Sequence, residues 1–183
     1  NQSPIASYLI EITAELFRLP DSQSDEKIVD RILDTAKQKG TAAWASAAAM
    51  QLQVPVPSLD VAVSQRILSS LKDLRIKTAA ISATESAANI ETGAGGLVTI
   101  VKDAIHFCMI VHFAQGISLL QKASATYNYK TDIAAVANAW RGGCIIRAEV
   151  LKDISTAYAA NPLLQNLMMS NVFNHRLQTS SAH

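Results

Sequence analysis

The sequence predicts an all-α fold, a multi-helix domain without a sheet, formed by a single domain over residues 1–183. Apolar residues recur every three or four positions along much of the chain, which is the spacing of one helix face. Serine, threonine and aspartate precede several of these stretches, where they can cap a helix N-terminus. No stretch shows the strict apolar and polar alternation of a half-buried strand.

Two helices are expected before residue 40. The first begins with Ser3 as N-cap and Pro4 as first helical residue, and it runs to about Phe17. The second is capped by Ser24 and carries Lys39 in its last turn. Gly40 is expected to end this helix in the left-handed conformation.

The next segments predict two helices and a loop. Thr41 to Gln53 is rich in alanine and helical, and Ser58 is expected to cap a helix that continues towards Lys77. Residues 78–96 contain many small residues with weak periodicity, so we expect a loop there.

The stretch from Leu97 to about Thr126 is apolar almost all round. Between Lys102 and Lys122 it approaches the length of a membrane span, but polar residues such as Asp103 and His112 interrupt it. A central helix packed on several sides by other helices explains the stretch better than a membrane span.

The C-terminal third predicts three more helices. Thr131-Asp132 caps the first, and the others cover Cys144 to Ala160 and Pro162 to Met169. Gly142-Gly143 suggests a close approach between helices. Arg141 and Arg147 on either side are expected to be structural or interfacial.

The composition and net charge indicate which partners and which cellular location to expect. Sixteen basic and fifteen acidic residues give a net charge of +1, which lacks the basic excess of a nucleic-acid-binding surface. Two cysteines form no disulfide framework, so a reducing, cytoplasmic location is expected. The chain starts at Asn1 without a signal segment, and we expect a piece of a longer protein.

Several apparent motifs predict no site. Gly93 to Gly96 lacks the third glycine and the preceding strand of a dinucleotide-binding loop. Cys108 and His112 share a helix face, but no third metal ligand follows on that face. His106 and His112 do not share a face, and both are expected to be core or boundary histidines with satisfied hydrogen bonds.

Lys39 and Arg66 are the stronger candidates. Arg66 lies at the margin of its helix's apolar stripe beside the small residues Ala62, Ser69 and Ser70, so it has room to point into a cleft. A planar guanidinium and a compact ammonium together suit a phosphorylated small molecule. The alternatives are a lysine that complements the helix dipole and an arginine whose stem lies along the helix edge.

At these residues the sequence resembles 6-phosphogluconate dehydrogenases. Gln38-Lys39-Gly40-Thr41 followed by Trp44 resembles the family's Gln-Lys-Gly-Thr-Gly-Lys-Trp segment, and the run from Ser69 to Asp73 resembles its Ser-Ser-Leu-Lys-Asp run. The eight residues from Trp140 to Arg147 are the most specific match. The resemblance covers nearly the whole chain outside residues 78–96 and the last few.

This resemblance implies a function. Members of the family oxidise 6-phosphogluconate with NADP and decarboxylate the product to ribulose 5-phosphate, as homodimers in the pentose phosphate pathway and without a metal. Lys39 and Arg66 match the lysine and arginine that hold the substrate's phosphate. We therefore expect 6-phosphogluconate and a second copy of the protein as partners, and neither nucleic acid nor a membrane.

The sequence also departs from the family pattern. Ala42 and Ala43 stand where the family has glycine and lysine, which alters the rim of the expected pocket. Nothing resembles the family's NADP-binding domain, its catalytic lysine and glutamate or its C-terminal tail, so this chain alone is expected to be inactive. His112, His175 and His183 are not expected to take catalytic roles.

Two hypotheses stay open at this point. The chain is either the substrate-binding and dimerisation part of an enzyme, or a non-catalytic helical module for assembly or sugar-phosphate binding. A reading frame that continues upstream into a glycine-rich nucleotide fold would favour the first, and one that starts near Asn1 would favour the second.

Overall fold

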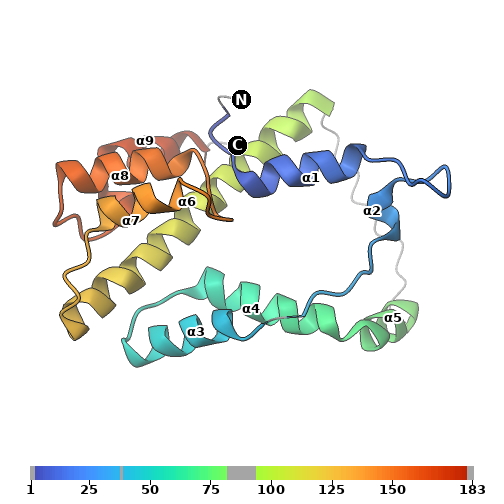
Figure 1. Ribbon diagram of the computed structural model, residues 1–183, viewed down its shortest axis with the longest axis horizontal. Coiled ribbons are helices and arrows are strands. Elements are labelled where there is room, and N and C mark those ends of the chain that lie inside the picture. The colour runs from blue at the N-terminus through green and yellow to red at the C-terminus, as the bar shows by residue number, and fades with distance from the viewer. Residues whose placement is uncertain (1–2, 38, 82–93, 181–183) are drawn as a thin grey trace.

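The computed structural model describes residues 3–37, 39–81 and 94–180, and its helices confirm the predicted all-α class (Figure 1). Within these ranges no β-strand forms, and two isolated bridges join Ser7 with Ala148 and Pro20 with Lys27. In chain order the elements are α1 (Tyr8–Arg18), α2 (Ile28–Arg31), α3 (Thr41–Gln51), α4 (Pro57–Ser70), α5 (Lys72–Ile81), α6 (Ala94–Tyr127), α7 (Ile133–Trp140), α8 (Val150–Ala160), the 3-10 helix η1 (Leu167–Met169) and α9 (Asn171–Ser180).

The hydrophobic core lies in the C-terminal half of the chain. There the second half of α6 packs with α7, α8, η1 and α9 (Figure 1). Asp132 caps α7 by accepting a hydrogen bond from the Ala135 amide at 3.1 Å, as the sequence predicts. The largest fully buried side chains are those of Ile110, Ile117, Val150, Leu151, Ile154, Tyr158, Leu167 and Phe173.

The first half of α6 is covered much less. Leu97, Val98 and Val101 are exposed, and only 17% of the most apolar window of α6 is buried. The expectation of a helix packed on several sides is therefore right for the second half and wrong for the first, because composition does not tell which sides neighbouring elements cover. By length and composition α6 is the one helix of the described ranges that could cross a membrane, a test that core helices of soluble proteins also pass.

Helices α3, α4 and α5 form an arm that meets the rest of the fold where α4 contacts α6 (Figure 1). Val56 is the N-cap of α4, so Ser58 lies inside the first turn and the predicted cap at Ser58 is wrong. The amide and hydroxyl of Ser58 both donate to Gln115 Oε1 on α6, at 3.0 and 2.7 Å. A side chain from another helix thus satisfies the helix N-terminus.

Helix α1 begins later than predicted. Its N-cap is Ser7 rather than Ser3, and Ser7 Oγ accepts a hydrogen bond from the Ile10 amide at 3.3 Å. The chain before α1 is held by the segment before α8, because the Tyr8 amide donates to the Arg147 carbonyl oxygen at 2.9 Å. This pairing fixes the start of α1.

The second predicted helix is shortened to α2. Its N-cap is Lys27, while the Ser24 hydroxyl donates to Asp21 Oδ2 at 2.8 Å. Residues 32–37 are not helical, because side chains of α4 and α5 bond to their backbone and replace the helical hydrogen bonds. Gly40 does have a positive φ of +94°, but as the N-cap of α3 rather than as the end of α2.

The expected helix from Ser58 towards Lys77 is broken at Leu71, between α4 and α5. Both ends of the loop expected over residues 78–96 are helical, since α5 reaches Ile81 and α6 starts at Ala94. The middle of that expected loop, residues 82–93, lies outside the described residues.

Near the C-terminus the predicted boundaries shift again. α8 starts at Val150 rather than Cys144, because the chain turns at Gly143, where φ is +75°. Close helix approach does not explain Gly142-Gly143: a Cβ on Gly142 would lie 3.8 Å from the nearest atom, and one on Gly143 would meet nothing within 4 Å. Only η1 forms in the helix expected over residues 162–169, and α9 follows without having been predicted.

Candidate functional site

Lys39 and Arg66, the two residues that the sequence singles out, come from adjoining parts of the arm. Lys39 is exposed and directly precedes Gly40, the N-cap of α3. Arg66 is exposed on α4, and its Nη2 donates a hydrogen bond to the Lys37 carbonyl oxygen. The structure therefore brings the Arg66 guanidinium to the segment that carries Lys39.

The Arg66 guanidinium can serve two acceptors. It has five N–H donors in a planar fork, and the Lys37 carbonyl takes one of them. A second acceptor such as a phosphate oxygen can be bound through another edge of the same fork. Its bond to Lys37 consequently orients Arg66 without excluding an anion.

The N-terminus of α3 adds a third element to this site. Gly40 has no side-chain oxygen to cap the helix, so the N–H groups of the first turn point outward from the helix end. Such an end carries a partial positive charge and favours anions. Ala42 and Ala43 lie in this first turn and contribute no charge.

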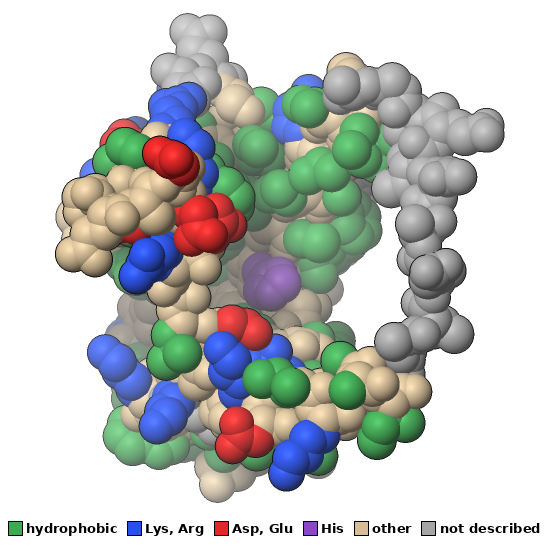
Figure 2. Space-filling model, turned by 90° about the vertical axis from the view of Figure 1, so that its right-hand side faces the viewer, with side chains coloured by type: hydrophobic (Ala, Val, Ile, Leu, Met, Phe, Trp, Pro, Cys, Tyr) green, Lys and Arg blue, Asp and Glu red, His purple; other side chains and the backbone are tan. Residues whose placement is uncertain are grey.

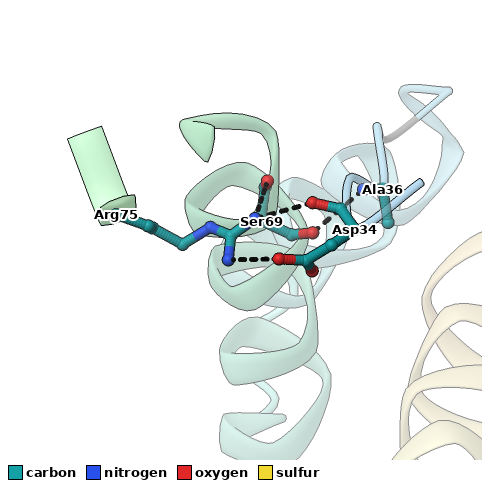
Figure 3. Close-up of polar contacts among 4 residues, drawn as sticks. All are labelled: Asp34, Ala36, Ser69 and Arg75. Carbon is teal, nitrogen blue, oxygen red and sulfur yellow. Dashed lines mark hydrogen bonds and ion pairs between the residues drawn. The ribbon is translucent and has the colours of Figure 1, made fainter. Parts of the chain in front are cut away.

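The segment between α2 and α3 is held in place by side chains of α4 and α5 (Figure 3). Arg75 Nη1 donates to Asp34 Oδ2 at 3.0 Å, and its Nη2 donates to the Asp34 and Ser69 carbonyl oxygens at 2.7 and 3.2 Å. Ser69 Oγ accepts from the Ala36 amide at 2.9 Å. The Arg75 hydrogen bond and charge lower the pKa of Asp34.

An apolar groove of about 600 Å³ lies elsewhere, between α1, α4, α6 and the 145–148 segment. On the face of the molecule drawn in Figure 2, hydrophobic side chains gather along a hollow that lies between two more charged parts of the surface. His112 and Met109 line the groove, and His112 Nδ1 lies 2.9 Å from the Cys108 carbonyl oxygen. Neither Lys39 nor Arg66 is among the residues that line it.

A second groove, of about 590 Å³, is lined by charged residues of α1 and of the segment before α8. Arg147 forms an ion pair with Glu11 at 3.2 Å, and its guanidinium carbon lies 5.1 Å from the Tyr8 ring centroid. Arg141 Nη1 donates to Asn138 Oδ1 at 3.1 Å. These contacts join Arg147 to α1 and Arg141 to α7, and the expectation that both arginines are structural or interfacial stays a prediction.

His106 departs from its expected role. It is buried at 5% exposure, but its Nε2 has no hydrogen-bond partner among the described residues. Burial lowers the pKa of His106, and the charge of Arg176 lowers it further. The expectation of a core histidine is thus right, and that of satisfied hydrogen bonds is wrong. Across the described ranges no group of three or more His, Cys, Asp and Glu residues could hold a metal ion.

Comparison with known proteins identifies the family. Residues 1–183 match the family described as 6-phosphogluconate dehydrogenase, C-terminal domain. The chain belongs to this family. A solved 6-phosphogluconate dehydrogenase from Plasmodium falciparum, described in its apo form and in complexes with its cofactor NADP+ and its substrate 6-phosphogluconate, matches with a TM-score of 0.93 and 32% identity over 100% of this chain and 39% of that one.

Two curated relatives of the 6-phosphogluconate dehydrogenase family give the same result. The NADP(+)-dependent, decarboxylating enzyme of Bacillus subtilis is 35% identical over 98% of this chain and 38% of its own. The decarboxylating enzyme of Synechococcus elongatus is 38% identical over 97% of this chain and 38% of its own. The chain therefore spans well under half the length of the 6-phosphogluconate dehydrogenases it matches.

Sequence reasoning missed Asp34 and Arg75, which hold the segment before Lys39. They lie 41 residues apart, and the distance between them along the chain gives no periodic signal. The sequence marks Ser69 as a small neighbour of Arg66 and as part of the run that resembles 6-phosphogluconate dehydrogenases, but neither signal indicates its bond to the Ala36 amide. The phosphate-binding roles of Lys39 and Arg66 stay predictions.

Proposed function

We propose that this chain forms the phosphate end of the substrate pocket of an NADP-dependent 6-phosphogluconate dehydrogenase, together with part of its dimer contact. Arg66 carries the proposal: its bond to the Lys37 carbonyl oxygen brings the guanidinium next to the segment that leads through Lys39 to the N-terminus of α3. A guanidinium, an ammonium and the N–H groups of a helix end are three complementary donors for a phosphate.

In this proposal Lys39 and Arg66 bind and orient one end of 6-phosphogluconate. Binding energy at a remote phosphate can hold the reacting carbons in position, which lowers the entropic part of the barrier. NADP, bound mainly by a part of the protein outside this chain, accepts the hydride, and decarboxylation then gives ribulose 5-phosphate. We propose no metal in this reaction.

The wider setting follows from the family. We propose a homodimer that works in the cytoplasm, in the pentose phosphate pathway, and binds neither nucleic acid nor a membrane. The net charge of +1 supports the absence of nucleic-acid binding, because phosphate backbones require a basic surface.

The 183-residue chain alone is proposed to be inactive. By the resemblance, its sequence contains neither the nucleotide-binding segment nor the lysine and glutamate that exchange protons with the substrate. An assay of NADPH formation with NADP and 6-phosphogluconate tests this directly. Turnover by the pure chain would overturn it.

Titration calorimetry with 6-phosphogluconate tests the phosphate site. Lys39→Ala and Arg66→Ala are each expected to weaken binding by about ten- to a hundredfold, since a charge-assisted hydrogen bond contributes about 1.5–3 kcal/mol. Arg31→Met is the matched control, because Arg31 is an arginine of the neighbouring helix α2 that pairs with Asp21. Equal affinity of Arg66→Ala and the unchanged protein would contradict the proposal.

A further inference from the structure

Arg75 donates hydrogen bonds to three acceptors, two on Asp34 in the segment before α3 and one at the end of α4. Its guanidinium joins the carboxylate and carbonyl of Asp34 to the Ser69 carbonyl oxygen at the end of α4 (Figure 3). The Arg75 side chain is 29% exposed, although that of Asp34 is 70% exposed. One rigid fork thus connects α5, the end of α4 and the segment between α2 and α3.

Two further hydrogen bonds continue this connection towards Lys39. The Ala36 amide donates to Ser69 Oγ at 2.9 Å, and the Lys37 carbonyl oxygen accepts from Arg66 Nη2. Successive parts of the segment are therefore each bonded to α4 or α5. Lys39 lies two residues beyond the last of these bonds.

The segment has little local structure of its own. Residues 32–37 are non-helical, with one local backbone hydrogen bond within them, from the Thr35 amide to the Leu33 carbonyl oxygen at 2.7 Å. Its position therefore depends on side chains from α4 and α5. A shift of about 1 Å at a binding group is enough to weaken a charge-assisted contact strongly.

We propose that Arg75 is a positioning residue for the phosphate site: through Asp34 and Ser69 it holds the segment that Arg66 also binds and that precedes Lys39. This inference rests on the proposed function. Arg75 acts through the backbone of residues 34–37 and touches no substrate. The same bonds could serve folding alone, but an exposed ion pair of this kind adds little to stability. An effect of Arg75 on ligand affinity therefore distinguishes the two roles.

The test is calorimetry with 6-phosphogluconate on the 183-residue chain, with the helical signal at 222 nm recorded for each variant. Arg75→Met is expected to weaken binding about tenfold and leave the helical signal unchanged. Arg75→Lys recovers part of the affinity, because an ammonium keeps the charge but cannot reach all three acceptors in one plane. The control Arg31→Met, which removes another Arg–Asp pair, binds as the unchanged protein does.

A comparison of double variants distinguishes a positioning role of Arg75 from a general loss of folded structure. In a Lys39→Ala background the effect of Arg75→Met is expected to shrink, because the residue being positioned is gone. If Arg75→Met loses its helical signal, Ser69→Ala is used in its place. This variant removes only the hydrogen bond between Ser69 Oγ and the Ala36 amide. Ser69→Ala is then expected to weaken binding about threefold.

The outcomes also separate this inference from the function on which it rests. One outcome overturns the positioning role and leaves the phosphate site in place: Arg66→Ala binds weakly, but Arg75→Met binds with normal affinity. Where Ser69→Ala is the variant used, its normal affinity has the same meaning. Undiminished affinity of Arg66→Ala overturns the phosphate site itself. An undiminished effect of Arg75→Met in the Lys39→Ala background also contradicts positioning of Lys39.

Discussion

Arg75 holds Asp34 at two points, with Nη1 3.0 Å from Oδ2 of the carboxylate and Nη2 2.7 Å from the carbonyl oxygen of the same residue. The two residues are 41 positions apart in the chain. Their contact joins α5 to the segment before α3, and a planar guanidinium is suited to such a two-point contact. Through this contact α5 holds the segment that precedes Lys39 in the chain.

The Asp34 carboxyl should report this contact directly. The Arg75 hydrogen bond, followed by its charge, holds the pKa of Asp34 below its ordinary value of 3.8. A lowered folded-state pKa stabilises the fold above pH 3.8, and this contribution is lost as the pH falls through the folded-state value. An NMR titration of the Asp34 carboxyl carbon should show the lowered pKa in the unchanged protein and a return towards 3.8 in Arg75→Met. The same pKa in both proteins would contradict the contact.

His106 should make the free energy of unfolding depend on pH in a higher pH range than Asp34 does, below about 6.5. Burial lowers the pKa of His106 below 6.5, with Arg176 and Lys102 lowering it and Asp103 and Asp153 raising it. The unfolded chain then binds a proton at a higher pH than the folded chain, so the free energy of unfolding decreases as the pH falls below about 6.5.

Replacing His106 by leucine removes this titration. Urea unfolding between pH 7.5 and 5 should therefore show a smaller pH dependence in His106→Leu than in the unchanged protein, whatever the absolute stabilities are. His112→Leu is the control, because His112 is exposed and lies on the same helix. Identical pH slopes for His106→Leu and the unchanged protein would show that His106 is not the group responsible.

Gly142 and Gly143 allow a comparison of the same substitution with and without backbone strain. Gly143 has a φ of +75°, which a side chain disfavours, whereas Gly142 lies outside that region and a Cβ there would make only an ordinary contact at 3.8 Å. Gly143→Ala should lower the free energy of unfolding by about 1–2 kcal/mol, and Gly142→Ala should change it by less than about 0.5 kcal/mol. Thermal unfolding of both variants checks this, and equal effects would rule out the turn at Gly143 as the cause.

Gln115 should control how α4 is attached to α6. Its Oε1 accepts from both the amide and the hydroxyl of Ser58, so Gln115→Ala leaves a part-buried helix N-terminus without its acceptor. The expected loss is about 1–2 kcal/mol, with faster hydrogen exchange at the Ser58 amide. Gln51→Ala, an exposed change at the end of α3, is the control. Unchanged exchange at Ser58 in Gln115→Ala would contradict the attachment.

The sequence predicts those parts of the fold whose signals are local. The all-α class follows from the spacing of apolar residues, and the start of α7 follows from Asp132, because a cap and its acceptor lie within one turn. The positive φ of Gly40 was also predictable, since glycine is the residue that adopts it at least cost.

Features that depend on distant residues could not be predicted. The helix expected from Ser24 ends early because Ser69 and Arg75, from more than thirty positions away, bind its backbone. The sequence predicts Ser58 as the cap of α4, because nothing local shows that Ser58 bonds to Gln115, 57 residues away. In the candidate site, the helical pattern predicts Arg66 at the margin of the apolar stripe of its helix. Its hydrogen bond to the Lys37 carbonyl oxygen is visible only in the fold.

Phosphorus NMR of 6-phosphogluconate titrated with the 183-residue chain tests the central claim most directly, because the signal reports the phosphate end of the ligand. We expect the signal to shift or broaden with the unchanged protein and with Arg31→Met, to change little with the double variant Lys39→Ala/Arg66→Ala, and to recover when inorganic phosphate competes. The same response from the double variant as from the unchanged protein, or no response from the unchanged protein, would contradict a phosphate site at Lys39 and Arg66.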